Sequence, residues 1–123
     1  MDLVVGIYEL TRTLPKPEVY GLSSQMQRAA VSVPANFAEG HTRNSLKEYL
    51  HFLSIARASL AEVETYLELV QRLSYVPPDR IGPLLDLTIS THRQLIALRN
   101  SLTARLREDP FPYDTMTVRP HEV

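Results

Sequence analysis

The sequence predicts an all-α protein, an antiparallel up-down-up-down bundle of four helices. Apolar residues recur three or four positions apart through most of the chain, the spacing that puts side chains on one face of a helix. Four such segments are joined by short stretches, and short connections favour antiparallel neighbours. We therefore expect one bundle domain over residues 1–108 and an irregular, proline-containing tail over residues 109–123.

The composition bounds the class of protein. Of 123 residues, 44% are hydrophobic and 22% are charged, which is the balance of a globular domain. No apolar run approaches the roughly 20 residues of a membrane-spanning helix and no secretory signal opens the chain, so we expect a cytoplasmic protein. The absence of cysteine excludes disulfides, thiolate catalysis and cysteine-based metal sites. A formal net charge of −1 gives no overall basic field for nucleic acid.

The first helix is predicted over about residues 2–14, where Pro15 ends it because proline cannot continue the hydrogen-bond ladder. Its apolar face consists of Leu3, Ile7, Leu10 and Leu14. No capping residue precedes this helix, which leads us to expect that an upstream segment is missing from the sequence.

The second helix is predicted over about residues 22–39. Ser24, with Gln27 three residues later, matches a capping box at its start. Pro34 predicts a kink, because it lacks the N–H that reaches back one turn, and Gly40 predicts a C-terminal stop. The apolar face is formed by Leu22, Met26, Ala29, Ala30, Val33 and Phe37.

A polar line runs along another side of the second helix. Its members are mostly uncharged, unlike a solvated face rich in Lys and Glu, and this favours an interface or a bound partner. An ordinary solvated face remains an alternative, as does a structural role in which side chains bond backbone groups freed near the proline. The line consists of Gln25, Arg28, Ser32, Asn36 and Glu39.

The third and fourth helices are predicted over about residues 45–74 and 79–107, the third opened by a capping box of Ser45 and Glu48. Each carries a core line and a second apolar line. The second lines predict a subunit interface of a homo-oligomer, although broad burial inside a monomer would also explain them. The predicted interface residues are Phe52, Ile55, Tyr66, Leu69, Leu85, Ile89 and Ile96.

The fourth helix contains the one basic segment of the chain. Between Asp86 and Glu108 the only charged residues are arginines, which suit contacts with phosphates or with an acidic partner. Arginines near a helix C-terminus also complement the helix dipole, so a structural role stays open. The candidate contacts are Arg93, Arg99, Arg105 and Arg107.

Catalytic motifs are weak. Glu48 and His51 have the Glu-x-x-His spacing of di-iron bundles, but such a site needs a second copy and two further glutamates. No nucleophile elbow and no Gly-rich phosphate loop occurs. We therefore expect no catalytic residue, metal, cofactor or small-molecule substrate.

One set of residues around the second and third helices matches a known family. It consists of Pro15, Lys16, Glu18, Tyr20–Leu22, Gln25, Arg28–Ala30, Ser32–Gly40, Arg43, Ser45, Glu48, Tyr49, Phe52, Leu53, Ala56, Ser59, Leu60 and Glu62. In these residues the chain resembles the four-helix-bundle proteins associated with intervening sequences in bacterial 23S ribosomal RNA genes. That resemblance implies a left-handed bundle that assembles as a ring-like homo-oligomer, with a pentamer expected, and no known enzymatic activity. The chain is also similar to accessory proteins of diversity-generating retroelements, which bind a reverse transcriptase and nucleic acid.

Three residues depart from the family pattern. Ala58 stands where glycine is usual, and Phe37 and Tyr49 stand where isoleucine and phenylalanine are commoner. The resemblance and the basic segment together favour a non-enzymatic oligomeric scaffold or binding module for RNA or a ribonucleoprotein partner. The alternative is a protein–protein adaptor for a reverse transcriptase that uses the polar line, and the third hypothesis is a metal enzyme built on the single Glu-x-x-His.

Overall fold

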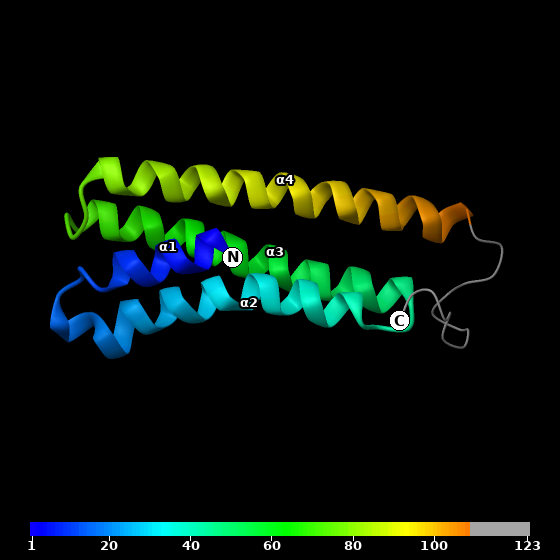
Figure 1. The fold of residues 1–123 in the computed structure, drawn as a ribbon, viewed down its shortest axis with the longest axis horizontal. Coiled ribbons are helices and arrows are strands. Elements are labelled where there is room, and N and C mark those ends of the chain that lie inside the picture. The colour runs from blue at the N-terminus through cyan, green and yellow to red at the C-terminus, as the bar shows by residue number, and fades with distance from the viewer. Residues whose placement is uncertain (109–123) are drawn as a thin grey trace.

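The structure, a computed structural model, describes residues 1–108, and the predicted tail lies outside the described residues. Four α-helices make up the domain, and residues 1–108 contain no strand: α1 Asp2–Thr11, α2 Ser24–His41, α3 Leu46–Arg72 and α4 Pro78–Glu108. Figure 1 shows their axes lying close to parallel, with successive helices joined at alternate ends. The predicted all-α, four-helix fold is confirmed.

Helix α1 ends at Thr11, three residues earlier than predicted. The next turn is held by the Thr13 hydroxyl, which donates to the Leu10 carbonyl at 2.7 Å, and by the Leu14 N–H, which donates to the Thr11 carbonyl. Leu14 is still buried, so the apolar face continues past the helix itself. A 3₁₀ turn and a π-helical turn, Lys16–Glu18 and Val19–Ser23, then lead directly into α2.

The predicted capping box of Ser24 and Gln27 is wrong. Ser23 before the helix already has helical angles, φ −58° and ψ −46°, and no side chain caps the start of α2. The Gln27 amide instead donates to the Thr11 hydroxyl at 3.0 Å and links α2 to the end of α1. A continuous helical approach leaves no unpaired N–H groups for a cap to satisfy.

The predicted stop at Gly40 is also wrong, because α2 continues to His41 and no described glycine has a positive φ. Gly40 lies where α2 meets α3. A Cβ atom at this position would lie 3.0 Å from both Phe52 Cβ and Tyr49 Cδ1. Glycine is therefore used here for close packing of two helices, and not for the left-handed conformation of a helix end.

The capping prediction for α3 is confirmed. The Ser45 side chain accepts a hydrogen bond from the Glu48 N–H at 3.0 Å, as a capping serine does. The helix ends two residues before its predicted end, and Ser74 in the following turn has a φ of 59°. Helix α4 runs from Pro78 to Glu108, one residue longer at each end than predicted.

The buried side chains form two clusters along the bundle. All four helices contribute to the larger one, whereas the smaller consists of Leu46 and Leu53 from α3 and Leu102 from α4. The division follows from the length of α1, which has 10 residues against 31 in α4 and lies along only part of the bundle (Figure 1). At the end of the bundle that α1 does not reach, Phe37 and Tyr49 are only half-buried.

Candidate nucleic-acid interface

Between Glu48 at the start of α3 and Glu108 at the end of α4, one part of the α3–α4 pair carries only positive charge. Helix α3 contains no Asp or Glu over residues 49–61, and α4 contains none over residues 87–107. These two stretches lie side by side, because Leu53 and Leu102 share the smaller core cluster. We call them the basic end, and their charged residues are Arg57, Arg93, Arg99, Arg105 and Arg107.

A polar hollow of about 540 Å³ lies between the two helices at the basic end. Ser54 lies on the α3 side of the hollow, and its hydroxyl donates to the Leu50 carbonyl at 3.2 Å. On α4 the Thr103 hydroxyl donates to the Arg99 carbonyl at 2.8 Å. The lining residues are Leu50, Ser54, Arg99, Asn100, Thr103, Ala104 and Arg107.

The four candidate arginines of α4 do not share one surface. Arg99 and Arg107 line the hollow, and among residues 1–108 no carboxylate forms an ion pair with either of them. Arg93 lies one to two turns before Arg99, outside the lining. Arg105 lies about 200° around the helix from Arg107, and both are in the last turn of α4, where they also complement the helix dipole.

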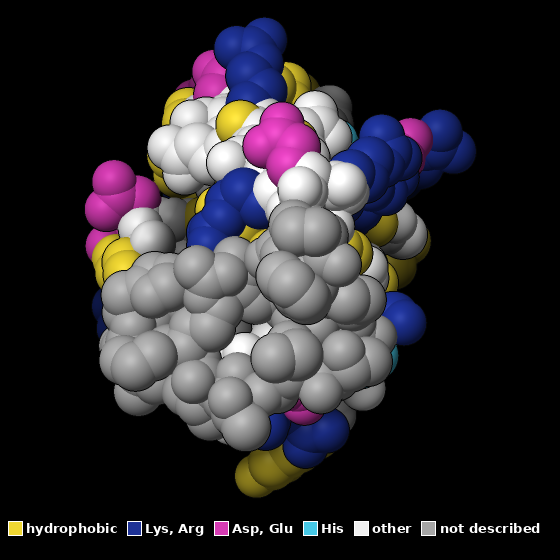
Figure 2. Space-filling model, turned by 90° about the vertical axis from the view of Figure 1, so that its right-hand side faces the viewer, with side chains coloured by type: hydrophobic (Ala, Val, Ile, Leu, Met, Phe, Trp, Pro, Cys, Tyr) yellow, Lys and Arg dark blue, Asp and Glu magenta, His cyan; other side chains and the backbone are white. Residues whose placement is uncertain are grey.

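The charge of the molecule is separated along the α3–α4 pair. The opposite end, residues 62–72 of α3 and 78–86 of α4, contains five acidic residues against Arg72 and Arg80. One of its acids, Glu68, accepts from Arg72 at 2.9 Å in an exposed ion pair. Figure 2 looks at the end of the bundle where α4 ends, and Lys and Arg side chains lie there on the upper half, the side of α4, with Asp and Glu side chains among them.

Arg57 was not among the residues predicted from the sequence, because one arginine among uncharged neighbours in a long helix forms no pattern. Arg57 lies three residues after Ser54, on the same side of α3, so it extends the basic end toward the middle of the bundle. The signal that points to it is the absence of acidic residues in two stretches at once. That signal has meaning only when the two helices are known to run antiparallel.

Two residues of the polar line on α2, Ser32 and Asn36, form hydrogen bonds within the chain. The Asn36 amide donates to the carbonyl and to the hydroxyl of Ser32, at 2.8 and 2.9 Å. The Ser59 hydroxyl of α3 donates to the Ser32 hydroxyl at 2.7 Å, and Ser59 itself is buried. These three residues connect α2 to α3, so Ser32 and Asn36 have a structural role between helices, which differs from the predicted bonding of the backbone group that Pro34 leaves free.

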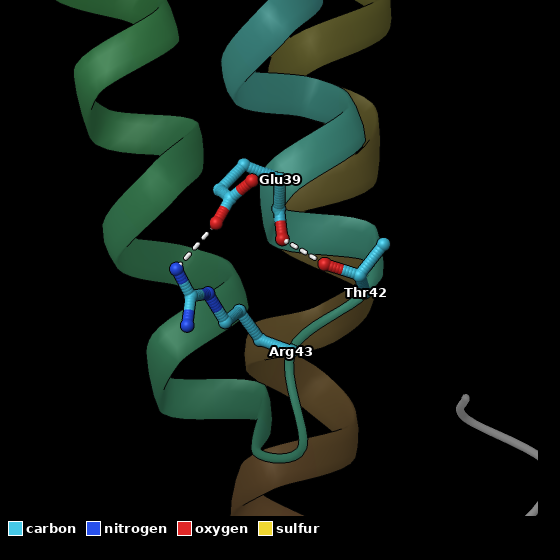
Figure 3. Close-up of polar contacts among 3 residues, drawn as sticks. All are labelled: Glu39, Thr42 and Arg43. Atoms are coloured by element: carbon cyan, nitrogen blue, oxygen red, sulfur yellow. Dashed lines mark hydrogen bonds and ion pairs between the residues drawn. The ribbon is translucent and has the colours of Figure 1, made fainter.

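The other members of the polar line are exposed. Gln25 and Arg28 lie on the surface of α2, and Glu39 forms an ion pair with Arg43 just after the helix (Figure 3). The Arg43 guanidinium also lies 4.7 Å from the centroid of the Phe52 ring. Arg43 therefore connects the end of α2 to α3, through its contacts with Glu39 and with Phe52.

The predicted apolar interface is divided between two sides of the bundle. Phe52 packs beside Gly40 of α2, and it lies about 200° around α3 from Leu50, which borders α4. Leu69 and Ile89 are the most open members, with 40% and 49% of their surface exposed. Ile55, Tyr66, Leu85 and Ile96 are half-buried. The interface itself stays a prediction.

An apolar groove of about 490 Å³ lies next to the first residues of α1, between α2 and α4. Val33, Phe37 and Ala38 of α2 form one wall, and Thr91 and Gln94 of α4 form the other. The groove exists because α1 stops short of the smaller core cluster. Within residues 1–108 it is the most apolar of the hollows that we describe.

Residues 1–108 contain no group of three or more His, Asp or Glu side chains placed to hold a metal ion. Glu48 and His51 border a hollow at the start of α3 together with Arg43 and Lys47. No helix of the described part is long and apolar enough to cross a membrane.

These features define a class, the all-α proteins built as a four-helix bundle. The chain belongs to the 23S rRNA-intervening sequence protein family, whose model matches residues 1–97. A crystal structure of a protein with unknown function from the S23 ribosomal protein family of Bacteroides thetaiotaomicron VPI-5482 superimposes with a TM-score of 0.74. The two chains are 24% identical over 80% of this chain and 92% of the other, which supports the fold. No curated protein matches the sequence significantly.

Proposed function

We propose that the protein is a non-enzymatic, homo-oligomeric binding module of the cytoplasm, and that it binds RNA or a ribonucleoprotein partner through the basic end. The observation that carries this proposal is the polar hollow between α3 and α4, flanked by Arg99 and Arg107. Membership of a family named after an intervening sequence of 23S rRNA supports RNA as the partner.

The local charge supports this proposal better than the net charge does. The whole chain has a formal charge of −1, but the basic end contains five arginines and no acid. Guanidinium groups bind phosphate through paired hydrogen bonds, and they keep their charge at any physiological pH. Each phosphate contact releases counterions, so binding through this surface should weaken steeply as salt is added.

The test is a salt titration of RNA binding by the full chain and by Arg99→Gln/Arg107→Gln. We expect the double variant to bind more weakly and its log–log salt slope to fall by about 1 to 2, because two phosphate contacts are lost. The matched control is Arg72→Gln/Arg80→Gln, which removes two exposed arginines from the acidic end. Absence of RNA binding by the unmodified protein at low salt would reject the function, and equal losses in both variants would reject the site.

The homo-oligomer, a pentamer by family resemblance, is the second part of the proposal. Exposed Leu69 and Ile89 support it, because large apolar side chains that are 40% and 49% open gain from burial against another copy. Light scattering at micromolar concentration should give a mass of several chains. A mass of 14.0 kDa would contradict this part and leave RNA binding by single chains.

The alternative function is an adaptor for a reverse transcriptase. The observation that favours it is on the outer side of α1 and α2, where Tyr8 and Val31 are 39% and 42% exposed beside Arg28. Apolar side chains next to an arginine are typical of protein–protein contacts. Arg28→Ala should abolish capture of a reverse transcriptase from the native host and leave RNA binding unchanged.

A further inference from the structure

We propose that the hollow between α3 and α4 binds the sugar–phosphate backbone of double-helical RNA, in preference to unpaired bases and to DNA. This inference rests on the proposed function, since it names the form of RNA that the same surface accepts. Three properties of the lining residues carry it: the arginine donors, the hydroxyl acceptors and the absence of aromatic rings.

The donors are placed for phosphates. Arg99 and Arg107 are eight residues apart, so their Cα atoms are about 12 Å apart along the axis of α4. That separation lets the two guanidinium groups meet different phosphates. Both sit on a helix of 31 residues, which holds their spacing fixed. A regular double helix presents phosphates at fixed spacing, whereas a flexible strand must be ordered first.

The acceptors distinguish ribose from deoxyribose. The hydroxyl protons of Ser54 and Thr103 are committed to the carbonyls of Leu50 and Arg99. Their oxygens therefore offer lone pairs to an incoming group and no hydrogen. The ribose 2′-hydroxyl can donate to such an acceptor, and it is exposed across the wide, shallow minor groove of an A-form RNA helix. Deoxyribose has no such donor.

The lining lacks the aromatic side chains on which most proteins that bind single strands stack unpaired bases. Arginine planes can also stack on bases, but Arg99 and Arg107 of the hollow are assigned to phosphates in this proposal. Neither Phe, Tyr nor His is among the seven residues of the hollow, whose apolar members are Leu50 and Ala104. Without stacking, the energy of binding must come from phosphate and ribose contacts, which depend on the shape of the duplex and little on its sequence.

The experiment measures fluorescence anisotropy of the full chain with three probes of one sequence: an RNA duplex of about 16 base pairs, its single strand and the matching DNA duplex. We expect the RNA duplex to bind about tenfold more tightly than either other probe, the effect of one or two hydrogen bonds. Ser54→Ala/Thr103→Val should abolish the preference for RNA over DNA and leave DNA binding unchanged.

The control for the threonine is Thr65→Val. Thr65 is exposed and its hydroxyl also donates to a backbone carbonyl, that of Ala61 at 3.0 Å, but it lies on the acidic end of α3. This variant should keep the full preference for RNA. Tighter binding of the single strand would overturn the inference and leave the proposed function intact, as would equal binding of both duplexes. Failure of all three probes to bind at low salt would overturn the proposed function itself.

Discussion

Gly40 sets the distance between α2 and α3, and Gly40→Ala tests that role. A Cβ atom at this position would lie 3.0 Å from Phe52 Cβ and 3.3 Å from the Tyr49 carbonyl oxygen. Neither atom can move away by a change of rotamer, because one is fixed to the backbone and the other belongs to it. The added methyl must therefore be accommodated by a shift of one helix against the other.

The magnitude follows from two opposing terms. Forcing an extra carbon into a packed interface costs about 1 to 3 kcal/mol. Replacing glycine by alanine inside a helix returns about 1 kcal/mol. We therefore expect the free energy of unfolding to fall by about 1 kcal/mol, within a range of about 0 to 2, and the Tm to fall by about 4 to 8 °C per kcal/mol for a domain of this size.

The control is Gly21→Ala. Gly21 lies in the π-helical turn before α2, it has no positive φ, and no heavy atom lies within 4 Å of an added Cβ. Alanine there restricts the unfolded chain without a clash, so stability should rise by about 0.4 to 1 kcal/mol. Urea unfolding followed by circular dichroism, at one protein concentration, compares the variants. If Gly40→Ala stabilises the protein as much as the control does, the close-packing argument is wrong.

Two further predictions concern single side chains. Ser45→Ala should lower the free energy of unfolding by about 1 kcal/mol, because it removes the cap of α3, whereas Ser24→Ala removes no cap and should change little; equal effects in urea unfolding would contradict this. Burial raises the pKa of the Tyr49 phenol above its ordinary value of 10.0. The folded state therefore holds this proton more tightly. The resulting stability is fully present below pH 10 and is lost as the pH rises from 10 through the higher pKa of the folded state. Tyr49→Phe should flatten the alkaline loss and Tyr20→Phe, at a 95% exposed residue, should preserve it, as measured by unfolding between pH 8 and 11.

The core of the bundle follows from periodicity alone. Leu3, Ile7, Leu10 and Leu14 were predicted on one face of the first helix and all four are buried, even though the helix ends before Leu14. Burial depends on the direction of a side chain, and a single turn after the helix preserves that direction. Helix ends are harder, since Thr11 and Thr13 bond local carbonyls in a way that no apolar pattern reveals.

The two capping motifs show why local signals need tertiary context. Ser24 and Ser45 are each followed three residues later by Gln or Glu, yet only Ser45 caps a helix. The chain approaches Ser45 in extended conformation, with φ −126° and ψ 150°, whereas it approaches Ser24 already coiled. A cap needs free N–H groups, and the π-helical turn before α2 leaves none.

The candidate site depended on a property that no short window contains. Neither Arg57 of α3 nor the spaced arginines of α4 form a motif, and each segment taken alone fits an ordinary solvated helix. Antiparallel packing places the acid-free stretch of α3 against the acid-free stretch of α4, and their charges then add because no carboxylate lies between them. A helix pair can in this way bind a polyanion although the chain as a whole has a formal charge of −1. If the proposal holds, the acidic opposite end would add selectivity, since it would repel the same backbone and so confine a bound duplex to one end of the bundle.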